Sequence, residues 1–292
     1  MGTEIVQAII DGLLTGGVYA LMAAGLTLIF GVLDIINIAQ GAFVVLGAYL
    51  SYVLWNNVGI NPFLGLLVTI PALFLVGIGV EWAFIRRLGS RDRVTMSILV
   101  TYAVWLIIEG TLDIAFGTNS VQTRPGFATS SFFIFGFYLP HIYVYGFVLA
   151  VVLLAGLYVM LYRSRFGASL RASLQDRTAA QLIGVNVNRV STITFGIGVA
   201  VTAAGGMVFG TVGAFNANSS ADLISRLLSI VILGGLGSVG GAMGAAMFML
   251  VLEDVVAVWS PLWAPVVYFA ALLLVLSIRP VGLFGRAATR AQ

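Results

Sequence analysis

The sequence predicts an all-α polytopic membrane protein, and its composition and hydropathy pattern carry that prediction. Of the 292 residues, 60% are apolar and only 9% are charged, whereas a soluble domain carries about 25% charged residues. So few charges cannot cover a globule with a hydrated surface. Apolar runs of about 20 residues recur along the chain, and each is long enough to cross a bilayer as a helix. A soluble enzyme, a nucleic-acid-binding protein and a disulfide scaffold are excluded, and residues 1–292 are expected to form a single transmembrane domain.

The residue types that are missing narrow the function further. All 14 basic residues are Arg, so the chain lacks the Lys of a G-x-x-x-x-G-K-[ST] nucleotide-binding loop. There is no Cys, and the only His is His141, which lies in a predicted external connector. No G-x-S-x-G or H-E-x-x-H motif is present. We therefore expect a transport protein, without enzymatic activity, metal site or cofactor.

Eight or nine helical crossings are expected. The predicted helices cover approximately residues 6–30, 35–54, 63–86, 94–116, 142–162, 190–212, 223–238, 240–258 and 262–279. The seventh segment is short and runs into a dense group of glycines within residues 234–244, which is unfavourable for one uninterrupted helix. We therefore predict a break between two elements there, and a broken or re-entrant element is an alternative to a full crossing.

Arginine placement predicts the orientation, because short cytoplasmic loops collect Arg and Lys. Three clusters are present: Arg86, Arg87, Arg91 and Arg93; Arg163, Arg165, Arg171, Arg177 and Arg189; and Arg279, Arg286 and Arg290. An even number of predicted helices separates successive clusters, so all three can lie inside. The N-terminus is then outside and the C-terminus cytoplasmic. Arg124 and Arg226 are exceptions to this pattern.

Two long connectors are predicted, one on each side of the membrane. In the external connector, residues 117–141, an aromatic-rich segment at 131–140 predicts a small β-hairpin turning near Gly136. An interfacial aromatic belt is the alternative. The cytoplasmic connector, residues 163–189, contains a predicted helix of about two turns, with Asp176 as its N-cap and Gly184 as its stop. Such a helix would either dock a cytoplasmic partner or lie solvated in the loop.

Polar residues at membrane depth are costly and usually face a cavity or a neighbouring helix. Asn37 and Gln40 are three residues apart and would share a helical face, as would Glu109 and Asp113, which are four apart. Glu253 and Asp254 lie near the predicted outer end of the eighth span. For the acidic residues, a structural role in capping or pairing with Arg and a role in proton coupling both stay open.

Several motifs together are similar to one family. They are LLTGGVYAL at residues 13–21, INIAQG at 36–41, DRTAAQLIG at 176–184, GGLGSVGG at 234–241 and RPVGLFG at 279–285. Over nearly its full length the chain resembles the permease subunits of branched-chain amino acid ABC importers, the H-type more than the M-type. Two departures are Gln40, where the family usually has His, and Thr178, where it usually has Glu.

The resemblance implies a permease subunit in a bacterial inner membrane, working by alternating access. The implied partners are two ATP-binding cassette subunits, a second permease (M-type or a homologous copy), a periplasmic solute-binding protein and the lipid bilayer. Branched-chain amino acids are the expected cargo; urea, short amides and other organic acids are alternatives. The implied ATPase-coupling residues are Asp176, Arg177, Ala179, Ala180 and Gly184, and the implied solute path contains Asn37, Gln40, Gly41, Gly235 and Gly237.

The alternative from another functional class is a stand-alone secondary transporter coupled to protons or sodium. Its coupling groups would be Glu109, Asp113 or Glu253, the acidic residues predicted at membrane depth. The two functions differ in their energy source, because the importer needs partner ATPases and the secondary transporter does not.

Overall fold

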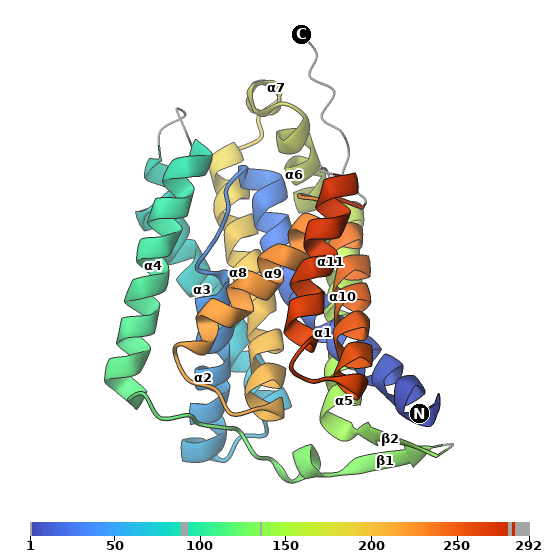
Figure 1. Ribbon diagram of the computed structural model, residues 1–292. Helices are drawn as coiled ribbons and strands as arrows, with labels where there is room; N and C mark the ends of the chain where they lie inside the picture. The colour runs from blue at the N-terminus through green and yellow to red at the C-terminus, as the bar shows by residue number, and fades with distance from the viewer. Residues whose placement is uncertain (1, 89–92, 135, 280–281, 284–292) are drawn as a thin grey trace.

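The computed structural model describes residues 2–88, 93–134, 136–279 and 282–283. Figure 1 shows a bundle of helices that run roughly along one axis, with a β-hairpin at one end and two short helices at the other. The bundle helices are α1 (Gly2–Leu33), α2 (Gln40–Val58), α3 (Pro62–Ala83), α4 (Arg93–Phe116), α5 (His141–Arg163), α8 (Val187–Val212), α9 (Ser219–Gly234), α10 (Val239–Trp259) and α11 (Ala264–Ile278). The short elements are α6 (Arg165–Gln175), α7 (Arg177–Leu182), β1 (Ser131–Ile134), β2 (Phe137–Pro140) and two 3-10 turns at Ile85–Arg87 and Gly126–Thr129.

The all-α polytopic prediction is confirmed. Within the described residues, seven helices are long and apolar enough to cross a membrane. The other two bundle helices, α9 with 16 residues and α11 with 15, are shorter. All nine predicted apolar segments are therefore helical, but the structure separates them into seven full-length helices and two short ones.

Helices α1 and α8 form the centre of the bundle. The most apolar stretch of α1 is 83% buried and that of α8 is 78% buried, whereas the corresponding stretch of α4 is 17% buried. Helix α1 packs against α10, α8 and α5, and α8 packs against α3, α2 and α1. Helices that are apolar on all sides belong in such a central position, because their whole surface must be covered.

Small residues let the central helices approach closely, as is common between membrane helices. At the crossing of α1 and α8, a Cβ on Gly198 would lie 2.6 Å from Ile29 Cγ1 and 2.8 Å from the Gly25 carbonyl oxygen. A Cβ on Gly47 of α2 would lie 3.0 Å from Ala203 Cα of α8. These backbones touch only because no side chain stands between them.

The second helix begins later than predicted. Residues 34–37 have no regular secondary structure, 38–39 form a turn, and α2 starts at Gln40 rather than at residue 35. The Gln40 side chain nevertheless contacts Gly25, which lies about 12 Å along the axis from the end of α1 at 1.5 Å per residue. Residues 34–39 therefore run from the end of α1 back into the bundle, and α2 begins at membrane depth (Figure 1).

The predicted glycine break is confirmed, although it is shorter than the glycine-rich run. Helix α9 ends at Gly234 and α10 begins at Val239. Gly235 and Gly237 in the connection have φ angles of +93° and +84°, which only Gly adopts without strain. The later glycines of the run, such as Gly241, lie inside α10, where Gly241 packs against the backbone of Gly234.

Both predicted connectors contain the expected element. Strands β1 and β2 pair antiparallel, with Ser131 opposite Pro140 and the turn at Gly136, so the hairpin is confirmed. Helix α7 occupies the predicted position after Asp176. The remainder of the cytoplasmic connector is not irregular, however: α6 precedes α7, capped by Ser164, whose side chain accepts a hydrogen bond from the Gly167 N–H.

The described arginines of the three predicted clusters lie in α6 or at the ends of helices that meet at the α6–α7 end of the bundle, opposite the hairpin (Figure 1). Arg91, Arg286 and Arg290, with Pro280, Val281, Phe284 and Gly285 of the closing motif, lie outside the described residues.

The described part of the closing motif at residues 279–285 packs on the glycine break: the Leu283 N–H donates to the Leu233 carbonyl at 2.7 Å. Two segments that resemble the same family thus meet in space.

The packing predicts unequal effects for two glycines of α3. A Cβ on Gly77 would lie 3.0 Å from Gly196 Cα and 3.0 Å from Val199 Cβ of α8, whereas Gly79 has open space around it. Gly77→Val should therefore lower the free energy of unfolding by about 1–3 kcal/mol through overpacking. Gly79→Val should leave it nearly unchanged. Thermal unfolding of both variants in detergent checks this, and equal losses would contradict the α3–α8 contact.

Candidate functional site

The first turns of α2 and α9 meet inside the bundle, and we call this place the junction; it contains Asn37, Gln40, Gly41 and Ser220. Asn37 and Gln40 are fully buried. The Asn37 Nδ2 donates to Gln40 Oε1 at 2.8 Å, and Gln40 Nε2 donates to the Gly198 carbonyl of α8 at 3.3 Å. A Cβ on Gly41 would lie 3.0 Å from Ile224 Cβ, so α2 rests directly on α9. The structure thus brings together three of the predicted path residues.

Asn37 and Gln40 meet for a reason other than the one predicted. Asn37 precedes α2, so the two residues do not share a helical face. They contact each other because the chain turns just before the helix, where the Gln40 N–H donates to the Asn37 carbonyl at 3.3 Å. The spacing of three residues identified the pair, but the turn brings the side chains together.

Two helix N-termini converge at the junction. Neither the Ala39 side chain before α2 nor the Asn218 side chain before α9 caps its helix. The first N–H groups of a helix carry partial positive charge, so broken helices at membrane depth favour anionic groups at this end. Within the described chain, Asn37 Oδ1 is buried without a hydrogen-bond partner. The first N–H groups of α9 already donate to Asn216, Ala217 and Asn218, so the junction offers donors from the start of α2 and one unused acceptor.

A polar stripe on α4 extends the junction along the bundle. Its members recur every four residues, so successive members are neighbours and the stripe winds gradually around the helix: Ser97, Thr101, Trp105, Glu109 and Asp113. Thr101 Oγ1 accepts from the Ile38 N–H at 3.1 Å. Trp105 Nε1 donates to Ser220 Oγ at 2.7 Å, and Ser220 Oγ donates to Glu109 Oε2 at 2.8 Å. Glu109 is thus tied to the first turn of α9.

Glu109 and Asp113 were predicted as candidates from the sequence, whereas Thr101 and Trp105 of the stripe, and Ser220 of α9, were not. The four-residue period from Ser97 to Asp113 could have identified Thr101 and Trp105 from the sequence. Ser220 has no such signal, because it lies more than 100 residues further along the chain and reaches α4 only through the fold.

Arg226 lies inside the bundle, which explains why it departs from the predicted arginine pattern. Its side chain is 16% exposed and pairs with Glu253 of α10 at 2.6 Å and with Asp222 at 3.3 Å. Its guanidinium also lies over the ring of Tyr268, 5.4 Å from the centroid. Glu253, a predicted coupling residue, is therefore one partner of a buried ion pair.

The α6–α7 end carries the predicted ATPase-coupling residues. The Asp176 side chain accepts from the N–H groups of Thr178 and Ala179 at 2.7 and 3.0 Å, as an N-cap does. Arg177 donates to the Val32 carbonyl at the end of α1, at 2.9 Å. Gly184 follows α7 with a φ of +89°.

Only part of α7 faces outward. Ala180 is 2% exposed and packs against the chain itself, whereas Ala179 is exposed. Leu182 and Ile183 are 84% and 76% exposed, although both are large and apolar. We call Ala179, Leu182 and Ile183 the α7 face. Exposed apolar residues on a helix tied firmly to the bundle are typical of an interaction surface.

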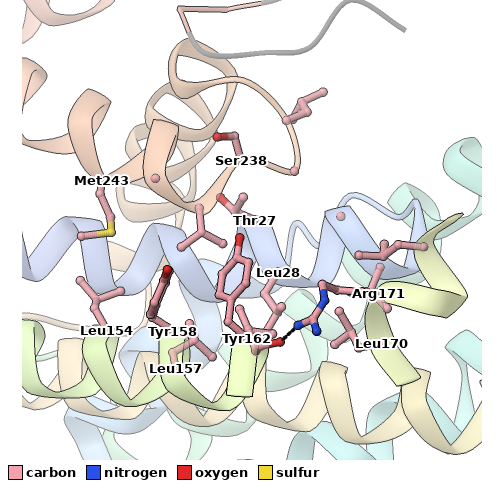
Figure 2. A pocket seen from close by; sticks show the side chains of 18 residues that line it. Thr27, Leu28, Leu154, Leu157, Tyr158, Tyr162, Leu170, Arg171, Ser238 and Met243 are labelled. Atoms are coloured by element: carbon pink, nitrogen blue, oxygen red, sulfur yellow. Dashed lines mark hydrogen bonds between the residues drawn. The ribbon is translucent and has the colours of Figure 1, made fainter. Parts of the chain in front are cut away.

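A cavity of about 680 Å³ connects this end with the glycine break. Figure 2 shows Tyr158 and Tyr162 of α5 extending toward Thr27 of α1, with Arg171 of α6 and Ser238 on the other walls. Arg171 donates to the Leu161 carbonyl and lies over the Tyr162 ring. Of the predicted path residues, Gly237 lines this cavity and Gly235 does not. Helix α6 and the α9–α10 connection thus share one cavity.

These features define a class: a polytopic membrane permease with helices that begin or end inside the bundle, a buried polar region beside them and an exposed helical loop at one end. The chain belongs to the family described as "Branched-chain amino acid transport system / permease component", whose model matches residues 8–276.

The names of similar proteins agree with this family assignment. The chain is 29% identical to the high-affinity branched-chain amino acid transport system permease protein BraD of Pseudomonas aeruginosa, over 96% of this chain and 95% of the relative. It is 28% identical to the corresponding LivH protein of Escherichia coli, with the same coverage. A fructose import permease protein, FrcC of Rhizobium meliloti, is 24% identical over 77% of this chain and 62% of the relative. No solved structure matches the chain significantly.

Proposed function

We propose that this chain is a transmembrane permease subunit of an ABC importer that moves branched-chain amino acids across a bacterial inner membrane. The family match over residues 8–276 carries the proposal. The partners would be two ATP-binding cassette subunits, a second permease (M-type or a copy of this chain) and a periplasmic solute-binding protein. The α6–α7 end, rich in arginine, would face the cytoplasm with the C-terminus, and the hairpin end would face outward with the N-terminus.

In this proposal the α7 face docks on an ATPase subunit. Movement of α7 would reach α1 through the hydrogen bond from Arg177 to Val32. Helix α6 lines the same cavity as Gly237, so the loop can also move the glycine break between α9 and α10. Asp176 and Gly184 set the two ends of α7, and Ala180 anchors it against the bundle. ATP hydrolysis by the partner would thus be transmitted to both α1 and α9.

The solute would pass the junction during alternating access. Its groups are polar and mostly uncharged, so a zwitterion can form hydrogen bonds there. It is released more easily than it would be from a site with a fixed charge. The carboxylate would meet the N-terminal N–H groups of α2, and the ammonium group the unused Asn37 Oδ1. Gly41 permits the close contact of the two helices, and Gly235 and Gly237 let α9 and α10 change their relative angle.

The alternative, a stand-alone secondary transporter, would use Glu109, Asp113 or Glu253 for coupling. Glu253 is paired with Arg226, and Glu109 is hydrogen-bonded to Ser220. Asp113 Oδ1 is buried without a hydrogen-bond partner among the described residues. This unpaired carboxylate oxygen is the observation that favours the alternative.

The docking role is tested at the exposed end of α7. Leu182→Ser combined with Ile183→Ser removes two apolar side chains, each worth about 1.5–3 kcal/mol on burial. Co-purification of the ATPase subunits should therefore weaken by at least about tenfold. Val58→Ser, at a residue 62% exposed at the opposite end of the bundle, serves as the control. Full retention of the ATPase by the double variant would remove the α7 face from the interface.

The energy source is tested with the purified chain alone in proteoliposomes. It should show no uptake of leucine above leak under a proton or sodium gradient, because the sequence has no nucleotide site of its own. Adding the partner subunits and ATP should start uptake. Concentrative uptake by the lone chain that is abolished by Glu109→Gln would establish the secondary transporter instead.

The path is tested with Gln40→Leu in the assembled complex. The lost hydrogen bonds should cost about 1 kcal/mol or less of stability in a membrane protein. Transport per folded complex should fall on the order of tenfold, which corresponds to about 1.4 kcal/mol on the barrier. Thr211→Val, which removes a buried hydroxyl bonded within α8, is the control and should transport normally. A large stability loss with an unchanged rate would assign Gln40 to packing.

A further inference from the structure

Two adjoining cavities lie at the hairpin end, away from the junction and from the cavity in Figure 2. The outer one, about 670 Å³, lies between the start of α1, the hairpin, α5 and the end of α10. The inner one, about 250 Å³, lies deeper, between α1, α5, α8, α9 and α10. Thr15, Tyr143 and Asp254 line both. The two cavities therefore adjoin at these three residues, and we call them together the recess.

The charged groups of this recess are of both signs. Asp254 lines both cavities, and its carboxylate makes no hydrogen bond or ion pair with any residue that the structure describes. Asp11, in the outer cavity, accepts from Gln7 at 3.0 Å. Arg226 is the single basic residue among the described lining residues, and it lies in the inner cavity beside Glu253. Ionisable groups at membrane depth mark substrate or ion pathways.

The remaining walls of the inner cavity are largely apolar. Met22, Val208 and Leu250 are buried core residues that line it. A pocket with apolar walls and a few convergent polar groups is the usual form of a small-molecule site. Its volume of about 250 Å³ is below the 300–1,000 Å³ typical of sites for drug-sized ligands. A smaller amphipathic molecule matches it better.

One face of α1 connects this recess with the junction. Asp11, Thr15, Val18, Met22 and Gly25 are spaced by four and three residues, so they form a single stripe along the helix. Asp11 and Thr15 line the outer cavity, and Thr15, Val18 and Met22 line the inner one. Gly25 lies against Gln40 Nε2 at the junction. The recess therefore ends one turn away from the polar groups of the proposed path.

We propose that this recess is an outer recognition site for a zwitterionic amino acid with an aliphatic side chain. The ammonium group binds Asp254, the carboxylate binds Arg226, and the side chain packs against Met22, Val208 and Leu250. The carboxylate replaces part of the contact between Arg226 and Glu253, and Asp222 continues to pair with Arg226. The direction of passage, from this recess to the junction, rests on the proposed function; the binding chemistry does not.

The absence of cysteine from the chain provides a direct test. Thr15→Cys places one thiol on the wall shared by the two cavities, and Asn57→Cys places one at an exposed position at the same end of the bundle. Both full-length variants are examined in right-side-out membrane vesicles washed free of soluble proteins, with a membrane-impermeant thiol reagent. Leucine at about ten times its dissociation constant should slow labelling of Thr15→Cys about tenfold, because only the free fraction reacts. Labelling of Asn57→Cys should not change.

Two leucine analogues and two further variants test the assigned contacts. Isopentylamine lacks the carboxylate and 4-methylpentanoate lacks the ammonium group, so neither should protect Thr15→Cys at the same concentration. Asp254→Asn should abolish protection by leucine, whereas Asp34→Asn, at an exposed residue just beyond the other end of α1, should preserve it. Should Thr15→Cys fail to insert, Ala257→Cys, in the outer cavity, is the second reporter.

The results separate this site from the proposed function. No protection by leucine, in a complex that still takes up leucine with ATP, overturns the recognition site and leaves the importer in place. Protection by isopentylamine equal to that by leucine also overturns it, because a site for cations alone would give that result. Protection by leucine without any ATP-dependent uptake supports the site and contradicts the importer.

Discussion

The contact between α1 and α8 at Gly25 and Gly198 is the interaction on which the rest of the structure depends. The two most buried helices cross there with no side chain between their backbones. The Gln40 amide enters at this crossing and donates to the Gly198 carbonyl. A larger residue at Gly25 or Gly198 would separate the helices and remove the place for Gln40. The start of α2 inside the bundle, and with it the position of α9, follows from this close approach.

Backbone groups at membrane depth must find partners inside the protein, since the hydrocarbon core supplies none. The chain meets this requirement differently at its irregular segments. Residues 36 and 38 use the Thr101 hydroxyl of α4, and the end of α9 uses the backbone of Leu283. Such segments are tolerated where they are buried in protein or line a cavity. At residues 36–40, polar side chains also converge on the irregular segment.

The two ends of the bundle differ in charge and in the surfaces they present. The α6–α7 end carries most of the arginines and the exposed apolar α7 face, and the hairpin end carries a recess lined by carboxylates around one buried arginine. Helix α1 runs between them: its first turns line the recess, Gly25 touches the junction, and its last turn accepts the hydrogen bond from Arg177. A small displacement of α1 would therefore reach both ends, as the proposed coupling of α7 to the opposite side requires.

The sequence alone determined the membrane class, the apolar helices, the hairpin, the α7 cap at Asp176 and the glycine break, because each depends on local composition, capping or backbone freedom. It also identified Asn37 and Gln40, since uncharged polar residues are conspicuous among apolar neighbours. It could not determine that α2 begins at Gln40, because residues 35–39 are mostly apolar and favour an earlier start, whereas in the structure the chain turns before Gln40, whose amide bonds to the Gly198 carbonyl. Nor could it identify Ser220 as the partner of Trp105 and Glu109, or place Arg226, Glu253 and Asp254 in one recess. Ser220 and Glu109 are 111 residues apart. Arg226 and Glu253 lie on successive helices but are still 27 residues apart, and the packing of the bundle brings each pair within contact distance.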